Sequence, residues 1–476
     1  MGTKRQKNQL ELAFPDDRRG EAPRAAAEGT EVPMARQGDE RPAGTEGFME
    51  EVVEDKNVKK ALRRVRSNRG SPGVDGMTVR ELPDCLREHW SEIRQHLLAS
   101  TYQPQPVKRV EIPKPGGGVR KLGIPTVLDR LIQQAILQVL QPRWDPMFSD
   151  SSFGFRPGRS AHQAVAQAQQ YASQGYTWVV DLDLEKFFDR VNHDRLMGRV
   201  AQRVQDKRLL KLLRAFLNAG VLDHGLVSST TEGTPQGGPL SPLQSNLVLD
   251  KLDRELESRG HRFVRYADDC NIYVRSERAG QRVMESVKRF VTGKLKLKVN
   301  KAKSAVDRAS KRSFLGFRFT EGERPRRDLA PEAKQRFQQR VRALTCRNRS
   351  VSLERRVEVL GRYLTGWNQY FGFCEMPSTL RHLDSWVRRR LRCAVWKQWK
   401  RGRRRFAELR LRDVGKDLAA RTAGSPRGPW RISRSPAMNC AFPIHVFDTL
   451  GLPRISPRPR AQPRRTAGYG PVRTVV

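Results

Sequence analysis

The sequence predicts an α+β protein in which a core of mixed helices and strand hairpins precedes a helical C-terminal part. Three observations lead to this prediction. Strand-like runs occur as hairpins at 107–124 and 263–274 and not as a regular strand–helix–strand repeat. Apolar residues at helical spacing separate these hairpins. After about residue 330 the strand signals stop, so we expect helices beyond that point.

The chain carries a large excess of positive charge, which narrows the classes of function. It has 476 residues, with 91 Lys and Arg against 51 Asp and Glu, and a net charge of +40. Hydrophobic residues make up 37%, below the roughly 45–50% of typical globular domains. Because such a charge repels itself in a compact fold, it indicates a polyanionic partner, with nucleic acid ahead of an anionic membrane.

Other classes of protein are excluded. No run approaches the roughly 18 apolar residues that a membrane span needs. The N-terminus lacks the apolar stretch of a secretory signal, and the six cysteines show no C-x-x-C spacing. We therefore expect a cytoplasmic protein with reduced cysteines, no zinc ribbon and no membrane association.

The elements before residue 330 can be predicted in order. Residues 1–46 lack apolar periodicity, which is typical of a disordered extension. Apolar residues from 51 to 66 recur at helical spacing. The run 107–124 reads as a hairpin around a glycine loop flanked by cations. An amphipathic helix at 129–140 and a buried strand at 176–183 follow.

The C-terminal part is predicted to be helical and strongly basic. Helical spacing continues through 360–371. The segment 388–405 contains ten Lys or Arg and no acid, together with Trp396 and Trp399. A solvated face is the usual explanation of a charge run, but ten cations without an acid favour RNA contact. Tryptophans in such a helix more often pack in the core than stack on bases.

Carboxylates embedded in apolar strands stand out in so basic a chain. Asp181 and Asp183 end one strand, and Asp268 and Asp269 occupy the tip of the second hairpin. Acids buried at strand ends are costly unless they are paired or bind metal. If the strands converge, the mutual repulsion requires cations, and oxygen ligands favour Mg²⁺. Two magnesium ions about 3.5–4 Å apart can activate a 3′-hydroxyl and stabilise a leaving pyrophosphate.

The ordered motifs resemble those of the reverse transcriptase/maturase proteins that bacterial group II introns encode. The resemblance covers most of the chain, from about residue 48 to 453. The matching blocks are GSPGVDG (70–76), IPKPGGGVRKLGIP (112–125), SFGFRPGRS (152–160), DLEKFFD (183–189), TPQGGPLSP (234–242), YADD (266–269), LKVNKAKS (297–304) and FLGF (314–317).

The resemblance implies a right-hand polymerase with fingers and palm at 47–330, and an α-helical thumb/maturase RNA-binding domain at 331–452. A Pro/Arg-rich tail would occupy 453–476. The implied function is RNA-directed DNA polymerisation by a two-metal mechanism, combined with folding of the group II intron RNA for splicing and retrohoming. The implied partners are that RNA in a nucleoid-associated ribonucleoprotein, target DNA and deoxynucleoside triphosphates.

The resemblance also assigns the catalytic acids. Asp183 and Asp268 match the two main magnesium ligands. Asp269 would be a further ligand or would support one. Asp181 is the rival of Asp183, but the family places an aromatic residue five positions after the ligand, which selects Asp183.

The same resemblance implies a nucleotide site. The aromatic residue is Phe188, which would exclude a 2′-hydroxyl, with Phe187 as the core-packing alternative. Gln236 would line the sugar and base of the nucleotide. Three cations would hold the triphosphate, namely Lys114, Arg120 and Lys303. A solvated basic hairpin is the alternative for the first two.

Two groups of cations are assigned to RNA. Arg156 and Arg159 would hold template phosphate. Intron RNA would contact the basic segment through Arg388, Arg389, Arg390, Arg392, Lys397, Lys400 and Arg401.

The chain departs from the family in one respect, and rival functions remain open. Many members carry a C-terminal endonuclease module with paired C-x-x-C, which is absent from this sequence, so we expect no nicking of the opposite DNA strand.

One rival function is that of an RNA chaperone with a decayed polymerase, which the intact acids argue against. Another is a free-standing reverse transcriptase in DNA repair or phage defence, which the maturase-like segment 345–450 argues against. A structural nucleic-acid protein would explain the charge but not the acids.

Overall fold

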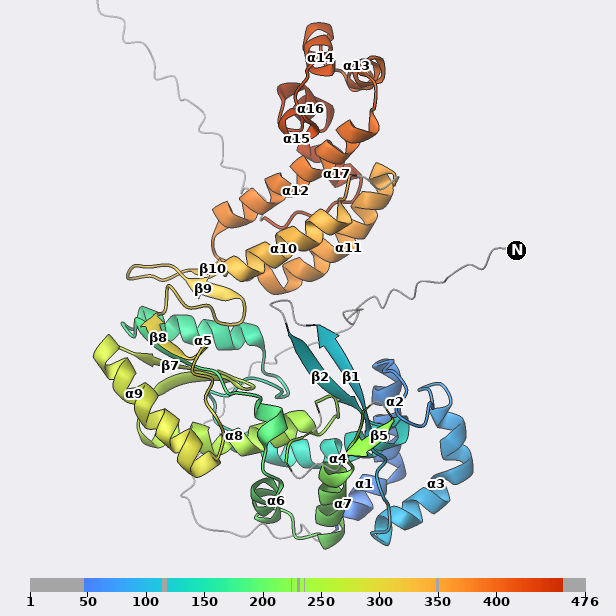
Figure 1. Cartoon of the computed structure of the whole chain (residues 1–476), viewed down its shortest axis with the longest axis vertical. Helices are drawn as coiled ribbons and strands as arrows, with labels where there is room; N and C mark the ends of the chain where they lie inside the picture. The colour runs from blue at the N-terminus through green and yellow to red at the C-terminus, as the bar shows by residue number, and fades with distance from the viewer. Residues whose placement is uncertain are drawn as a thin grey trace, which may run out of the picture.

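Two four-stranded sheets with covering helices form the first part of the chain, and helices alone follow β10 (Figure 1). The computed structural model describes residues 47–113, 118–223, 225–228, 232–234, 236–347 and 351–456. The predicted extension 1–46, the tail from 457 onward and Lys114 lie outside these residues. The α+β prediction is confirmed.

The first part begins with helices α1 (Phe48–Val53), α2 (Asp55–Ser67), α3 (Leu82–Leu98) and α4 (Val127–Trp144). The single helix expected at 51–66 is two helices, because Glu54 adopts an extended conformation between them. The first sheet has the order β2-β1-β4-β5, with β1 (Val107–Pro113) and β2 (Val119–Ile124) between α3 and α4, and with β4 (Val221–Asp223) and β5 (Leu226–Ser228) later in the chain. The antiparallel pairing of β1 with β2 confirms the first predicted hairpin.

The second sheet has the order β6-β7-β3-β8 and holds the acidic strands at its centre. Its strands are β3 (Trp178–Leu182), β6 (Arg262–Tyr266), β7 (Asp269–Val274) and β8 (Ala305–Arg308). Pairing of Leu182 with Cys270 sets the register of β3 against β7. The residue after Leu182 is Asp183, so this register carries it to the tip of the β6–β7 hairpin.

Strand alternation divides the second sheet between two hydrophobic cores. Val180 and Ile272 face one core, which includes α8 (Ser241–Ser258) and α9 (Glu277–Phe290). Val179 and Tyr273 face the other core, which includes α5 (Ala161–Ser173). Shorter connecting elements are η1 (Asp145–Met147), η2 (Phe187–Arg190), α6 (His193–Ala201), α7 (Lys207–Asn218) and the π-helix η3 (Val291–Leu295).

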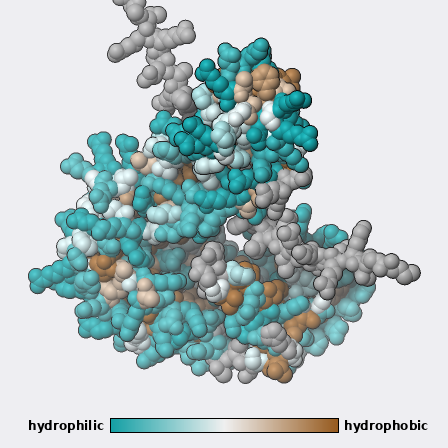
Figure 2. Space-filling view, turned by 45° about the horizontal axis from the view of Figure 1, so that its top comes forward, coloured by the Kyte–Doolittle hydropathy of each residue, from teal (hydrophilic) through white to brown (hydrophobic). Residues whose placement is uncertain are grey.

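The core on the α5 side continues into the helical unit, so the two parts of the chain share it. The strands β9 (Phe317–Phe319) and β10 (Arg327–Leu329) lie between them (Figure 1). The helices of the unit are α10 (Pro331–Leu344), α11 (Leu353–Phe371), α12 (Pro377–Gln398), α13 (Gly402–Arg410), α14 (Lys416–Ala423), α15 (Pro429–Ile432), α16 (Pro436–Ala441) and α17 (Ile444–Thr449). The face of the unit seen in the space-filling view is mostly hydrophilic (Figure 2).

The basic segment 388–405 is not the continuous helix that the sequence predicted. Helix α12 ends at Gln398, Trp399 leaves helical geometry with ψ 73°, and α13 begins at Gly402. Trp396 and Trp399 are buried and their rings meet edge to face. The bend therefore exists because two tryptophans pack into the core, as expected of tryptophans in such a segment.

A fully buried ion pair lies beneath the β6–β7 tip. The Arg265 guanidinium donates to both carboxylate oxygens of Asp253 on α8, and the Nε–Oδ1 distance is 2.7 Å. Its remaining donors reach Asn246 Oδ1, Ser152 Oγ and the carbonyl oxygen of Ala267. Because every branch of the guanidinium is paired, this arginine joins the hairpin to α8 and to the loop before α5.

Removing Arg265 should be strongly destabilising, because it leaves Asp253 charged and unpaired in the core. We expect Arg265→Met to lower the free energy of unfolding by about 3–5 kcal/mol in urea titrations. The matched control is Arg262→Met, an exposed arginine on the same strand. Adding Asp253→Leu to Arg265→Met should recover part of the loss. Equal losses for Arg265→Met and Arg262→Met would contradict this role.

Candidate active site

Asp183 is held at the end of β3 by the segment after the π-helix. Its backbone N–H donates to Ser304 Oγ at 3.0 Å, and its carbonyl accepts from the backbone N–H of Asn300 at 2.9 Å. One residue further on, Leu184 bridges to Val299. The LKVNKAKS motif therefore positions the acid, which is a role that sequence reasoning did not assign to Ser304 or Asn300.

Asp268 and Asp269 stand at the hairpin tip, where the backbone turns through Ala267 at φ +58°. The loop before α5 supports this turn from below. The backbone N–H of Phe153 donates to the carbonyl of Arg265, and a Cβ on Gly154 would lie 2.2 Å from the nitrogen of Ala267. No side chain fits at Gly154, so the SFGFRPGRS motif includes a glycine because two backbones touch there.

Burial raises the pKa values of the two tip carboxyls, and mutual repulsion adds to the effect. Burial and the charge of Asp183 raise the pKa of Asp268, whereas Arg120 and Lys303 lower it. Burial together with Asp268, Asp181 and Asp183 raises the pKa of Asp269 to about 6, although the residue is still exposed to solvent. The two strands thus bring the predicted acids close enough to interact.

Two of the three cations predicted to bind the triphosphate, Arg120 and Lys303, lie within the described residues. Lys303 Nζ lies 3.8 Å from Asp183 Oδ2 and is mostly exposed. Arg120 on β2 is exposed, and its charge acts on Asp268 from the β1–β2 hairpin. Both lie at the acidic cluster, so they are placed to meet an anion that approaches the carboxylates.

Asp181 has a different environment from Asp183. Arg312 donates to its carboxylate through Nε at 3.1 Å and through Nη2. Burial raises the pKa of Asp181, although Arg312 opposes the shift. An acid already paired with an arginine is less available to metal, which favours Asp183 as the ligand. No local pattern in the sequence pointed to Arg312 as this partner.

The carboxylates fit a magnesium site that is completed by substrate. Within the described ranges, no three acidic, histidine or cysteine side chains are gathered into a ready metal site. Mg²⁺ in polymerase-type sites is bound by one or two carboxylates together with substrate phosphates and water, not by a closed protein cage. Convergent acids with raised pKa values are the expected partners of such an ion, because the cation relieves their repulsion.

The two phenylalanines after Asp183 have distinct surroundings. Phe187 is 2% exposed and belongs to the core, whereas Phe188 is half-buried and only packs against that core. Their rings meet edge to face with centroids 5.2 Å apart. The carbonyl of Phe188 accepts from the N–H of Thr234 at 2.7 Å, and this bond joins Phe188 to the TPQGGPLSP segment (234–242). These environments favour Phe188 as the residue that meets a nucleotide.

Gln236 belongs to the TPQGGPLSP segment (234–242), which crosses the β1–β2 hairpin at this residue. Its carbonyl accepts from the N–H of Gly123 on β2 at 2.8 Å. A Cβ on Gly237, which has φ +126°, would lie 2.6 Å from the carbonyl oxygen of Gly123. This segment is rich in glycine because it passes directly over β2. The contact joins the β1–β2 hairpin to the segment before α8, near the predicted nucleotide site.

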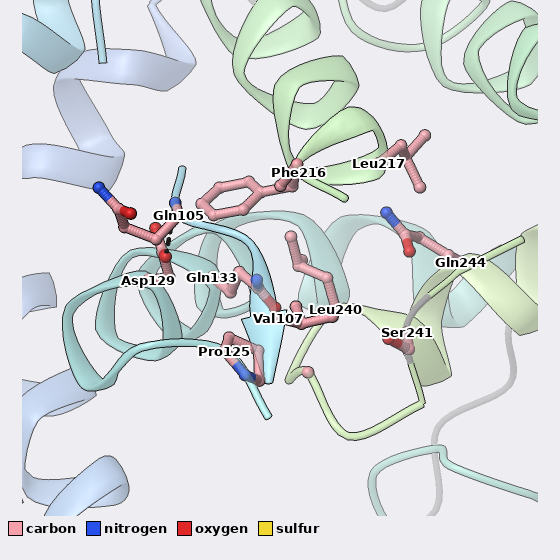
Figure 3. Close-up of a pocket in the computed structure, with 12 residues that line it drawn as sticks. Gln105, Val107, Pro125, Asp129, Gln133, Phe216, Leu217, Leu240, Ser241 and Gln244 are labelled. Carbon is pink, nitrogen blue, oxygen red and sulfur yellow. Dashed lines mark hydrogen bonds between the residues drawn. The ribbon is translucent and has the colours of Figure 1, made fainter. Parts of the chain in front are cut away.

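Beneath this loop a small pocket separates α4 from the start of α8 (Figure 3). The buried Asp129 at its edge accepts from Tyr102 Oη at 2.9 Å and from the backbone N–H of Gln105 at 3.1 Å. Thr126 Oγ1 donates a third bond at 2.7 Å. Burial nevertheless raises the pKa of Asp129 to about 6.

The structure revises the assignment of Arg156 to template phosphate. Its guanidinium is buried and donates to Asp145 Oδ1 at 2.9 Å and to the carbonyls of Ser149 and Ser152. It therefore folds the loop that supports the hairpin tip. Arg159 is half-buried and pairs with Asp150 at 2.6 Å, so it can still reach solvent.

The basic segment divides into buried and exposed cations. Arg388 lies 3.6 Å from Asp384, and Arg392 donates to the carbonyl of Phe442, so both are buried in the fold and not placed to bind RNA. Arg389 and Arg390 are half-buried. The exposed cations of the predicted set are Lys397, Lys400 and Arg401 at the bend between α12 and α13.

Two family profiles match the chain. Residues 112–319 match the family described as "Reverse transcriptase (RNA-dependent DNA polymerase)", and residues 334–411 match "Group II intron, maturase-specific domain". Protein YkfC of Escherichia coli K12 is 34% identical over 303 residues, which cover 55% of this chain and 80% of the relative. The chain belongs to the group II intron-encoded reverse transcriptases.

The group II intron-encoded protein LtrA of Lactococcus lactis is also similar, with 30% identity over 323 residues. That match covers 54% of each chain, so this reverse transcriptase spans about half the length of LtrA. Among solved structures, the partial Cas6-RT-Cas1–Cas2 complex is 25% identical and covers 53% of this chain and 43% of its own, with a TM-score of 0.34. Among the described helices, none is both long and apolar enough to span a membrane.

Because the carboxyl of Asp129 is buried beneath the TPQGGPLSP segment, we expect the stability of the protein to depend on pH. The folded pKa of Asp129 is about 6, above its ordinary 3.8. A carboxyl whose pKa is higher in the folded than in the unfolded state contributes its full stabilisation below its unfolded pKa. This contribution is lost as the pH rises through its folded pKa. The full shift corresponds to about 3 kcal/mol, and about 2 kcal/mol of this is lost between pH 4 and pH 6.

The measurement is the difference in unfolding free energy between the wild type and Asp129→Asn at several pH values. Asn does not titrate, and the change in its hydrogen bonds adds an offset that does not vary with pH. The advantage of the wild type should therefore shrink as the pH rises from 4 to 6. A difference that stays constant over this range would contradict the raised pKa.

Proposed function

We propose that this reverse transcriptase copies RNA into DNA and also binds its group II intron RNA to promote splicing and retrohoming. The observation that carries the polymerase function is the convergence of Asp183 from β3 with Asp268 and Asp269 from the β6–β7 tip. The proposed partners are the intron RNA in a nucleoid-associated ribonucleoprotein, target DNA and deoxynucleoside triphosphates.

Asp183 and Asp268 are the proposed ligands of two magnesium ions, and Asp269 is a further ligand or a support for one. When bound, magnesium supplies a charge that favours ionisation of the primer 3′-hydroxyl and stabilises the departing pyrophosphate. In the proposed reaction the 3′-oxygen forms a bond to the α-phosphorus, and the bond from that phosphorus to pyrophosphate breaks. The protein's part is to position these groups and to balance their charge.

Residues around the acids supply the nucleotide site in this proposal. Arg120 and Lys303 bind the triphosphate, since both already act on the carboxylates. Phe188 excludes a 2′-hydroxyl, and Gln236 lines the sugar and base. Lys114 would extend the same cationic hairpin, and it lies outside the described residues.

The maturase function is proposed to depend on the exposed cations of the helical unit. Lys397, Lys400 and Arg401 are free to meet phosphate, whereas Arg388 and Arg392 hold the helices together. Splicing by a group II intron is chemistry of the RNA, so the protein needs only to bind and stabilise its active fold. Polymerisation and splicing should therefore depend on different residues.

The test is a paired assay of primer extension and of intron splicing. Asp268→Asn should abolish most DNA synthesis on a primed RNA template but leave splicing intact. Replacing Lys397, Lys400 and Arg401 with Gln should impair splicing at physiological salt but spare extension of a short template. Each lost phosphate contact changes the salt slope of log affinity by about 0.7–0.9, so the slope should flatten by about 2.

The matched control replaces three exposed arginines of α9 with Gln, namely Arg278, Arg282 and Arg289. It removes the same charge from a helix on the far side of the palm sheet. Near-normal DNA synthesis by Asp268→Asn would refute the polymerase site. An equal loss of intron affinity in both triple variants would show that only net charge matters.

A further inference from the structure

An exposed tryptophan lies in the last part of the helical unit, beyond both segments that the family profiles match. Trp430 belongs to the short helix α15, beside α12 (Figure 1). It is 36% exposed, whereas Trp396 and Trp399 of the same unit are buried. An exposed tryptophan beside a well-packed core indicates a contact surface.

The position of Trp430 is fixed by the residues around it. Its carbonyl accepts from Arg389 Nη2 at 3.0 Å and from Ser433 Oγ at 2.7 Å. Pro429 opens the helix, and Ile432 is buried in the core. The backbone that carries the indole is therefore held in place, which reduces the entropy lost on binding a ligand.

One face of the indole is already covered by a cation. The Arg389 guanidinium carbon lies 3.8 Å from the ring centroid. Trp430 is still 36% exposed beside this contact, so part of it remains open to a second flat group. Aromatic rings backed by arginine are a common platform for nucleobases, because every base presents a π-face.

The charge around the ring favours a polyanion. Arg427, Arg431 and Arg434 are exposed, and none of the three guanidinium groups has a hydrogen bond or ion pair within the described part of the chain. The sequence from 418 to 447 contains no Asp or Glu. A protein partner would need matching acids, whereas a nucleic acid supplies both phosphates for the arginines and a base for the ring.

We propose that Trp430 stacks on an unpaired base of single-stranded nucleic acid, while Arg427, Arg431 and Arg434 contact the adjoining phosphates. This inference rests on the proposed RNA-binding function and adds a defined site to it. The site takes an unpaired base because bases inside a duplex are already stacked on their neighbours. The segment after the matched maturase domain is thus part of the nucleic-acid surface.

The direct test is photocrosslinking of the full chain to an oligonucleotide that carries 5-iodouridine, with the adducts mapped by mass spectrometry. We expect an adduct on the peptide that contains Trp430. The same oligonucleotide in a duplex should lose this adduct, and RNA and DNA versions compared side by side identify which strand supplies the base. Adducts elsewhere but none at Trp430 would overturn the stacking site and leave RNA binding standing. No adduct anywhere would count against the proposed RNA binding itself.

A second measurement separates stacking from charge. Trp430→Ala should weaken binding of the single strand by about 5- to 100-fold without changing the salt slope, because stacking releases no counterions. Trp430→Phe should retain most of the affinity. Arg431→Gln and Arg434→Gln together should flatten the slope by about 1.4. The control is Leu411→Ala, an apolar residue of the same unit that is 77% exposed. Equal effects of Trp430→Ala and Leu411→Ala would overturn the proposal.

Discussion

The acids of the palm stand together because one buried guanidinium, Arg265, holds the hairpin that carries two of them. It pairs with Asp253 on α8, reaches the loop before α5 through Ser152, and caps the turn at the carbonyl of Ala267. A buried ion pair adds little net stability compared with a pair of apolar residues, but it requires a strict geometry. Its role is therefore positional: it fixes the tip against which the end of β3 is aligned.

Charge balance explains why this arrangement can exist in a chain of net charge +40. Arg120 and Lys303 oppose the pKa shift that burial and Asp183 impose on Asp268. These two cations reach the cluster from the β1–β2 hairpin and from the segment after the π-helix. Other cations, among them Lys397, Lys400 and Arg401, lie on the surface of the helical unit, where a polyanion can offset their repulsion.

Much of this organisation could be predicted from the sequence. Both hairpins, the strand that ends in the acids and the helical C-terminal part follow from periodicity and turn residues, because these are local signals. The acids could be paired only through the ordered motifs, since no local rule brings residue 183 to residue 268. The family assignment rests on those same motifs and on the two matched segments.

What the sequence could not supply were the tertiary environments of charged residues. Arg156, Arg388 and Arg392 read as surface cations, because composition cannot distinguish an arginine that meets phosphate from one that meets a buried carbonyl. The partners Arg312 and Ser304 were missed for the same reason, since each lies more than a hundred residues from the acid that it contacts. The bend at Trp399 was missed because basic helical residues continue through it while its cause is tertiary packing.

We propose that β3 and the β6–β7 tip hold one shared metal site. Iron-mediated backbone cleavage provides the test: Fe²⁺ replaces Mg²⁺, and added hydrogen peroxide and ascorbate generate hydroxyl radicals at the bound ion. These radicals cut the chain near the ion whether or not the enzyme is active. With primer, template and incoming nucleotide bound, we expect two cuts, one around residue 183 and one around residues 268–269. Both cuts should be lost together in Asp183→Asn. Cleavage at only one of the two segments, or at neither, would contradict a shared site.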